Sequence, residues 1–177
     1  MSQVIIAGDT SGTITLQAPA VSGSTTLTLP AATGTVMVSG NMPAFSAYSS
    51  VGTTVSASTW TKLNFNTEEF DTANAFDSTT NFRFTPQVAG YYQINAAWQS
   101  NAITGNAYIA IYKNGSIYKF GSVMAAGTVG CEPVVSSLVL LNGSTDYVEI
   151  YAFSSISASA TAQAQNTYVN GCLARTS

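Results

Sequence analysis

Four acidic side chains form the one group in this sequence that could carry out acid–base chemistry: Glu68, Glu69, Asp71 and Asp77. A glycoside hydrolase needs two carboxylates several ångströms apart across a sugar. Neighbours in a strand point to opposite faces, so Glu68 and Glu69 would be separated, whereas Glu69 and Asp71 could share a face. Charges of this kind on an edge strand commonly discourage pairing between sheets. We therefore expect solvated edge charges and no enzymatic activity.

Histidine is absent, and cysteine occurs only at Cys131 and Cys172. The absence of histidine excludes Ser-His-Asp and Cys-His catalysis and every metal site built on imidazole. The two cysteines could form a disulfide, but isolated cysteines of this kind are more often free and buried. We expect no cofactor, and no set of metal ligands is recognisable.

The composition suits a β-rich protein with an uncharged polar surface. Apolar residues make up 46% of the 177 residues and charged residues only 7%, so Ser, Thr, Asn and Gln must keep the surface polar. The net charge is −3 and the five Lys and Arg residues are scattered, which leaves no basic stripe for nucleic acid. No apolar run is long enough to span a bilayer, and the N-terminus has no signal-peptide pattern, so we expect no membrane insertion.

Short alternating segments indicate strands from Pro43 onward. Apolar residues recur with period two in Tyr91–Gln99, and the Asn-Gly within Lys113–Ser116 is a strong hairpin signal. Many short strands, frequent turns and no helical period predict an all-β sandwich or jelly roll of about ten strands. The expected strands are Phe45–Ser49, Trp60–Asn66, Glu68–Asp71, Asn81–Thr85, Tyr91–Gln99, Ala107–Lys113, Ser116–Val123, Pro133–Leu141, Asp146–Phe153 and Thr167–Ala174.

The first forty residues contain no aromatic residue and cannot build a core alone. Three alternating segments, GTITLQAP, TTLTLPAA and GTVMVSG, are separated by Gly, Pro and Ser. A flexible linker is one interpretation, but the regular Thr/aliphatic alternation favours three chains that bury their aliphatic faces together. We predict a short β-rich stalk or attachment segment over residues 1–42 and a head over residues 43–177.

Several motifs of the head occur in a distinctive order. The stretch Phe70–Tyr92 carries Asn, Phe-Asp, Phe and Gly-x-Tyr at characteristic spacings, and PAFSAY, IYKNGS, LVLLNGSTDYVEI and YVNGCLA flank it. Together they resemble the globular-head family of complement component 1q, which shares its jelly roll with the tumour necrosis factor ligands. The resemblance implies a jelly-roll fold and a homotrimer.

The sequence departs from this family at two places. The family's Thr-Gly turn is Thr80-Asn81 here, where Asn could adopt the left-handed conformation that Gly supplies. Two extra residues lie between Gly143 and Asp146. For that reason no calcium role is transferred to Asp146.

The stretch Gly8–Val36 resembles segments common in bacteriophage tail fibres and other virion appendages. Together the two resemblances imply a virion structural protein: a trimeric tail fibre or appendage, bound to other virion proteins through its N-terminal segment. A trimeric capsid decoration or head-fibre protein and a bacterial surface adhesin are the alternatives. The adhesin would be favoured by a collagen-like tract, which the sequence lacks.

Tyrosines recur on the strand faces opposite the aliphatic residues. A monomer would leave such an aromatic patch in water, whereas a threefold interface would bury it. Scattered surface tyrosines are the alternative. The segment VVSSLVLL from Val134 is apolar on both faces after Ser137, which predicts a strand buried on both sides. The predicted interface residues, all on one sheet, are Tyr91, Tyr108, Tyr112, Tyr147 and Tyr151.

Connections of a jelly roll alternate between its two ends. The short turns Lys113–Ser116 and Leu141–Thr145 should share one end with both termini of the head, as the family resemblance implies. The longer loops Ser100–Asn106, Met124–Glu132 and Ser154–Asn166 should gather at the other end. They are either exposed tips or a surface for a neutral host glycan. The candidate receptor-facing residues are Asn101, Asn106, Glu132, Ser157, Gln163 and Gln165.

Overall fold

The computed structural model describes residues 3–7, 10–17, 20–21, 23–24, 26, 31, 38, 40, 42–100, 105–126 and 130–177. The named elements within these ranges are all strands. No helix in this part of the chain is long and apolar enough to cross a membrane. The chain divides into two compact units, residues 1–34 and 35–177. This division falls eight residues before the expected start of the head at residue 43, and the first strand of the head begins at Ala44.

The N-terminal unit contains an antiparallel hairpin of β1 (Gln3–Ala7) and β2 (Thr13–Gln17). Val4 pairs with Leu16 and Ile6 with Ile14, so these four side chains share one face. Each of them is more than half exposed. The strand β2 lies within the predicted segment GTITLQAP, whereas β1 was not predicted. The segments TTLTLPAA and GTVMVSG fall largely outside the described residues.

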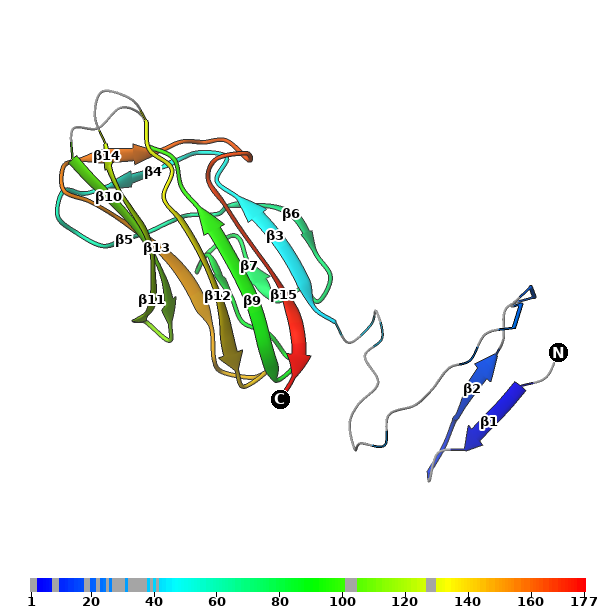
Figure 1. Ribbon diagram of the computed structural model, residues 1–177. Helices are drawn as coiled ribbons and strands as arrows, with labels where there is room; N and C mark the ends of the chain where they lie inside the picture. Colours follow the sequence, from blue (N-terminus) through cyan, green and yellow to red (C-terminus); the bar gives the residue numbers. More distant parts are fainter. Residues whose placement is uncertain are drawn as a thin grey trace. The chain divides into compact units, whose positions relative to one another are not determined.

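The head consists of two main sheets that lie face to face (Figure 1). One sheet has the order β12-β9-β15-β3-β6, and the other has the order β11-β10-β13-β8-β7, with β5 also paired to β13. A small third sheet joins β14 to β4. The bounds are β3 (Ala44–Tyr48), β4 (Thr53–Val55), β5 (Thr61–Lys62), β6 (Thr67–Asp71), β7 (Phe76–Asp77), β8 (Arg83–Phe84), β9 (Gly90–Ala97), β10 (Gly105–Lys113), β11 (Ser116–Ala126), β12 (Val134–Leu141), β13 (Val148–Ser154), β14 (Ala158–Ala160) and β15 (Tyr168–Thr176).

Aromatic residues from both sheets form the core between them. Phe45 of β3 stacks on Phe84 of β8, with 4.2 Å between ring centroids, and Tyr92 of β9 meets Phe84 edge-on at 5.3 Å. Tyr92, Ile94 and Trp98 are fully buried, as the alternation in Tyr91–Gln99 predicts. Each buried side chain of this size stabilises the fold by about 1.5–3 kcal/mol. The all-β jelly-roll prediction is confirmed.

The edge strands β11 and β12 close one side of the sandwich. A side chain at Gly121 of β11 would meet the Val134 carbonyl oxygen and the side chains of Ile109 and Val135. The Tyr118 hydroxyl donates to the Leu138 carbonyl of β12 at 3.4 Å. The absence of a side chain at Gly121 therefore lets the two sheets approach each other at this edge.

Several predicted strand boundaries differ from the structure. The segment Trp60–Asn66 forms a strand only at Thr61–Lys62, although Leu63 and Phe65 are fully buried. The left-handed residue near Thr80-Asn81 is Phe82, with φ 48°, so the prediction for Asn81 is wrong. The strands β4 and β14 were not predicted, because their Thr, Ser and Ala residues carry little period-two signal.

Candidate functional site

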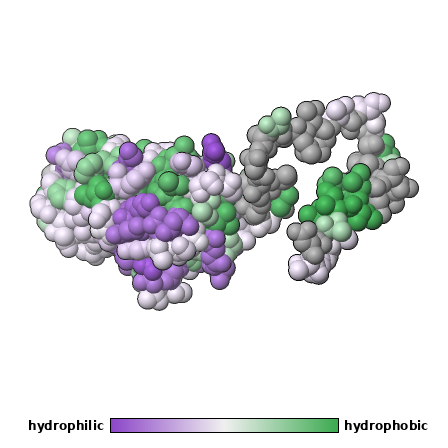
Figure 2. Space-filling view, turned by 90° about the horizontal axis from the view of Figure 1, so that it is seen from below, coloured by the Kyte–Doolittle hydropathy of each residue, from purple (hydrophilic) through white to green (hydrophobic). Residues whose placement is uncertain are grey.

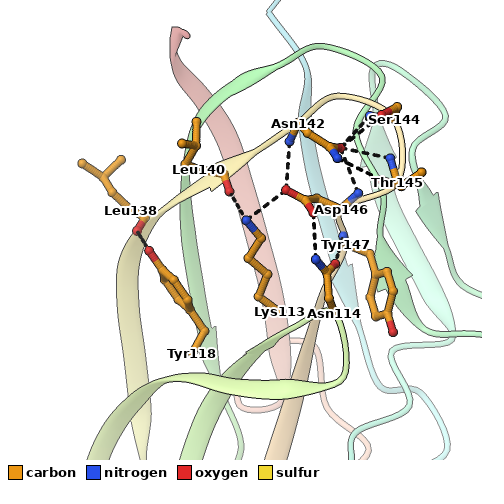
Figure 3. Close-up of polar contacts among 10 residues, drawn as sticks. All are labelled: Lys113, Asn114, Tyr118, Leu138, Leu140, Asn142, Ser144, Thr145, Asp146 and Tyr147. Carbon is orange, nitrogen blue, oxygen red and sulfur yellow. Dashed lines mark hydrogen bonds and ion pairs between the residues drawn. The ribbon is translucent and has the colours of Figure 1, made fainter.

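Two short turns meet at one end of the head. Asn114 and Gly115 both have positive φ, at 52° and 78°, as a two-residue Asn-Gly hairpin requires. The Asn114 side-chain amide donates to Asp146 at 2.7 Å, and its oxygen accepts from the Tyr147 N–H at 2.9 Å (Figure 3). The predicted pairing of these two turns at one end is therefore confirmed.

The carboxylate of Asp146 holds this end together. It forms an ion pair of 2.9 Å with Lys113, whose ammonium also donates to the Leu140 carbonyl at 2.7 Å (Figure 3). The hydrogen bond from Asn114, and then that from Lys113, lowers the pKa of Asp146. The two extra residues before Asp146 are accommodated by Asn142, whose side-chain oxygen accepts from the N–H groups of Ser144, Thr145 and Asp146 at 2.9–3.0 Å. These contacts assign Asp146 a structural role. Seen from this end in Figure 2, hydrophilic residues gather in one patch on the head.

The longer connections meet at the other end. Ser100 pairs with both Cys131 and Ala160 in isolated bridges, and the Ser155 N–H donates to the Asn106 carbonyl at 3.0 Å. The described parts of the three long connections thus lie together, as predicted. The C-terminus lies at the opposite end, where Thr176 pairs with Gly90.

The six candidate receptor-facing residues have different surroundings. Asn101 lies outside the described residues. Asn106 belongs to strand β10, so its assignment to a loop is wrong, because β10 begins at Gly105. Glu132 is partly buried, and its N–H contacts the Met124 sulfur at 3.3 Å. Ser157, Gln163 and Gln165 are exposed.

The connection from β13 to β15 is more ordered than a simple loop. It contains β14, which pairs with β4, and the Thr161 N–H donates to the Gln99 carbonyl at 2.8 Å. The side-chain oxygen of Gln163 accepts from Asn166 at 2.7 Å. Only the part after Thr161 therefore projects as a tip, with Gln163 bracing its base.

The four acidic residues serve separate local contacts. The carboxylate of Glu69 accepts from the Ser46 hydroxyl at 2.7 Å, and Glu68 accepts from the Ser78 hydroxyl at 2.5 Å. Asp71 accepts from the N–H groups of Ala75 and Phe76 at 2.6 and 2.7 Å. β6 is the edge strand of its sheet, as the edge-charge interpretation predicts.

Asp77 organises the turn that follows it. Its carboxylate accepts from the N–H groups of Thr79, Thr80 and Asn81 at 2.9–3.1 Å, and from the Asn81 side-chain amide at 2.6 Å. The hydrogen bond from the Thr80 N–H and then that from the Asn81 side chain hold the pKa of Asp77 well below its usual range. The carboxylates of Asp77 and Asp71 therefore accept hydrogen bonds from nearby backbone N–H groups and stabilise the local turns.

The predicted interface tyrosines do not all lie on one sheet. Tyr108, Tyr112 and Tyr151 lie on the outer face of the β11-β10-β13 sheet, and Tyr147 directly precedes β13. Tyr91 belongs to β9 on the other sheet, so the prediction of a single sheet is wrong. Alternation within a strand shows which face a residue takes, but sheet membership depends on long-range pairing.

Four of these tyrosines are buried or half-buried within the chain. Tyr112 stacks on Tyr151, with 3.8 Å between ring centroids, and is only 9% exposed. Burial raises the pKa of both hydroxyls. Tyr108 packs edge-on against Phe153 at 5.4 Å, and the Arg83 guanidinium lies 4.2 Å from the ring centroid of Tyr147. Contacts within one chain therefore already shield part of each of these four rings.

The outward face of the β12-β9-β15-β3-β6 sheet, here called the open face, exposes apolar side chains instead. Tyr91 pairs across strands with Leu140, and the two are 38% and 43% exposed. Val134 and Leu138 lie further along β12 and are each 51% exposed, as is Phe70 of β6. In the single chain one face of β12 is buried and the other lies on the open face, so burial of β12 on both sides, predicted as part of the trimer interface, stays a prediction.

A row of polar side chains crosses the middle of the open face. The Gln93 amide donates to the Ser136 hydroxyl at 2.9 Å, which donates to Asn95 at 2.8 Å. Asn95 in turn donates to Asn170 at 3.0 Å. The row is hydrogen-bonded within one chain, so it could be covered by another surface at a small desolvation cost.

The cysteines are free: Cys131 is buried and Cys172 is exposed on the open face. Burial raises the pKa of the Cys131 thiol. Across the described residues, no group of three or more His, Cys, Asp or Glu side chains is placed to hold a metal ion.

Comparison with solved structures shows the fold of the head. The globular domain of zebrafish complement 1qA protein is 17% identical, with a TM-score of 0.56 over 76% of this chain and 99% of that one. Murine APRIL is 9% identical, with a TM-score of 0.60 over 75% and 98% of the two chains. Eiger TNF from S. frugiperda is 8% identical, with a TM-score of 0.57 over 77% and 95%. No family model and no curated protein matches the sequence.

The head therefore has the jelly-roll fold of the complement 1q and tumour necrosis factor domains, as the sequence resemblance implied. At these identities the likeness concerns the fold. The surfaces that remain unpartnered within it, the open face above all, are the candidate functional sites.

Proposed function

We propose that this protein is a homotrimeric virion structural protein, a tail fibre or appendage, with a jelly-roll head carried on an N-terminal stalk. The observation that carries the trimer is the open face, where Tyr91, Val134, Leu138, Leu140 and Phe70 expose large apolar side chains on one sheet. Several large apolar side chains exposed on one sheet face commonly mark an interface. Their burial against further copies of the chain removes them from water.

The threefold arrangement is supported by the sequence resemblance to complement component 1q heads. In a threefold ring the interface would be heterologous: the apolar edge at β12 of one copy would pack against the open face of the next copy, and the third copy would close the ring. The hydrogen-bonded row at Gln93 and Asn95 would be covered without unpaired polar groups. Of the five tyrosines predicted for the interface, Tyr91 is the one whose surroundings suit it.

The N-terminal hairpin supports a stalk made of several chains. One face of the hairpin is apolar and exposed to solvent, and it consists of Val4, Ile6, Ile14 and Leu16. An isolated two-stranded hairpin is marginally stable in water. Figure 2 shows hydrophobic residues gathered on this unit. Three copies could bury these faces against one another.

The virion assignment is supported by the resemblance of Gly8–Val36 to tail-fibre segments, and we infer attachment to other virion proteins through residues 1–42. A host-surface glycan is the proposed target of the head. A trimeric capsid decoration protein is the second candidate, because it would need the same trimer and the same N-terminal attachment. Immunogold labelling of intact virions separates tail from capsid, and an unlabelled virion would contradict both.

The trimer is tested by multi-angle light scattering of the wild type and Leu138→Asp. The wild type should have three times the chain mass of 18.4 kDa. Leu138→Asp should give a folded monomer, because burial of three unpaired charges is costly. Val51→Asp is the matched control, since Val51 is 71% exposed away from the open face. A monomeric wild type contradicts the trimer, and a trimeric Leu138→Asp contradicts the open face as its interface.

A further inference from the structure

An aromatic pocket, here called the Trp60 pocket, lies on the outer face of the β11-β10-β13 sheet, the sheet opposite the open face. Its volume is about 440 Å³, and it is lined by Trp60, Tyr108, Phe120, Gly121, Val123 and Phe153. That volume lies in the range of small-molecule sites. The pocket shares no residue with the open face defined above, so trimer formation through that face does not require it.

Trp60 lies at the centre of the rings. Its ring centroid is 5.4 Å from Phe153, 5.8 Å from Phe120 and 6.4 Å from Tyr108. The interplanar angles of 46°, 39° and 65° present several ring faces and edges in different directions. Phe120 is 64% exposed and Val123 is 55% exposed, so one wall of the pocket is open to a ligand.

Backbone contacts on both sides hold Trp60 over the sheet. Before it, the Ser58 N–H donates to the Ser154 carbonyl at 2.7 Å, and Ser58 adopts a positive φ of 54°. After it, Thr61 and Lys62 pair with β13. Ser58 therefore holds a backbone conformation that non-glycine residues adopt rarely, and the hydrogen bond to Ser154 fixes it. The indole is therefore preorganised on the surface.

Two hydrogen-bonding groups accompany the rings. Neither the Trp60 indole N–H nor the Tyr108 hydroxyl hydrogen-bonds to another part of the described chain, and neither is a buried atom without a partner. Both groups therefore have contact with solvent. A ligand that has an apolar face and a hydroxyl-bearing rim matches this combination.

None of the described residues that line the pocket carries a charge. On β13 and the neighbouring β5, Glu149 forms an ion pair with Lys62 at 3.2 Å, which balances their charges. An anionic ligand would find no counter-charge in the pocket and would lose hydration on entry. The absence of a cationic side chain among these lining residues therefore disfavours an anion.

We propose that the Trp60 pocket binds an uncharged saccharide ring, whose C–H face packs on Trp60 and Phe120 and whose hydroxyls bond the Trp60 N–H and the Tyr108 hydroxyl. This assignment places the glycan site on the side of the head instead of on the loop tips. The proposed host-surface role is needed only to say that the glycan comes from the host surface; the binding itself does not depend on that role.

The test is titration of the full-length protein with maltohexaose, cellohexaose and an uncharged galactan oligosaccharide, and separately with an oligogalacturonate and benzyl alcohol. Trp98 is fully buried, so a change in tryptophan emission reports on Trp60, and calorimetry gives the affinity. At least one neutral saccharide should bind saturably. Phe120→Ala should lower that affinity about tenfold or more, as truncation of a central contact residue does.

Val51→Ala is the control, because Val51 is 71% exposed and belongs neither to the Trp60 pocket nor to the residues named for the open face. It should bind the saccharide with unchanged affinity. Failure of all three neutral saccharides to bind, preference for oligogalacturonate, or equal affinity in Phe120→Ala would overturn the assignment. Binding of benzyl alcohol alone would overturn it in favour of an apolar partner side chain. Light scattering of the same samples measures their mass, so a failure of the trimer can be told apart from a failure of saccharide binding.

Discussion

Asn114 and Asp146, 32 residues apart in sequence, share a hydrogen bond of 2.7 Å that joins the two short turns of the head. Each turn is itself fixed by local geometry: the first by positive φ at Asn114 and Gly115, the second by the hydrogen bonds to Asn142. The bond, together with the Lys113 ion pair, sets the spacing between β10 and β13 at this end.

Replacement Asp146→Asn should reduce the free energy of unfolding at neutral pH by about 1 kcal/mol, because a partly exposed ion pair and its hydrogen bonds are lost. The native pKa of Asp146 lies below the ordinary value of 3.8, so its contribution is complete above that value and is lost as pH falls through the native pKa. Urea unfolding between pH 7 and pH 2 should show a smaller acid-induced loss in the variant than in the wild type. Glu132→Gln, which removes a carboxylate without an ion pair in the described chain, should follow the wild type.

Gly143→Ala should destabilise the head by about 2–4 kcal/mol, because φ at this position is +72° and a Cβ would meet the backbone of Val88 and Ala89. Gly115→Ala is the comparison. Its φ is similar, at +78°, but the nearest atom to a Cβ is the Tyr147 hydroxyl at 3.6 Å, so only the conformational cost of about 1 kcal/mol remains. Thermal melts that gave equal losses for both variants would contradict the role of close packing at Gly143.

Tyr151→Asp should lower subunit stability, because it removes the stack on Tyr112 and places a carboxylate near Glu149. Circular dichroism melts of this variant should show a loss larger than for Leu138→Asp, whose side chain lies on the open face. If Tyr151→Asp instead leaves the melt unchanged and yields a monomer, the tyrosines of this sheet form the trimer interface after all.

A truncated protein that starts at Met42 should fold as a soluble β-rich head. The described core residues, from Phe45 to Leu173, all lie after this point. Far-ultraviolet circular dichroism and a cooperative melt measure the outcome. An unfolded truncated protein would show that the head depends on its N-terminal segment.

The exposed tip at residues 162–165 can be exchanged for a Gly-Ser linker without loss of β14. Replacement of the whole stretch Ser157–Gln165 would remove β14 and its pairing with β4. If the tip contacts a receptor, host adsorption should fall while the trimer persists. Unchanged adsorption by the exchanged protein, together with reduced adsorption by Phe120→Ala, would place the contact at the Trp60 pocket.

The sequence by itself determined the class of fold, because period-two alternation in Tyr91–Gln99 and the Asn-Gly at Asn114 depend only on local geometry. It also determined the end of the head at which each described connection lies, because antiparallel strands reverse direction at every turn. The strand β2 of the N-terminal unit was likewise predicted from the alternation of Thr and aliphatic residues.

Only the tertiary structure decided which sheet each strand joined. Pairing between residues far apart in sequence placed Tyr91 opposite Leu140, and Tyr108 and Tyr112 beside Trp60. The packing of the two sheets also left Leu138 on an outward face that no second layer of the chain covers, although its segment reads as doubly buried. Local alternation shows which side chains turn the same way. Which neighbours then cover them depends on contacts that no local pattern encodes.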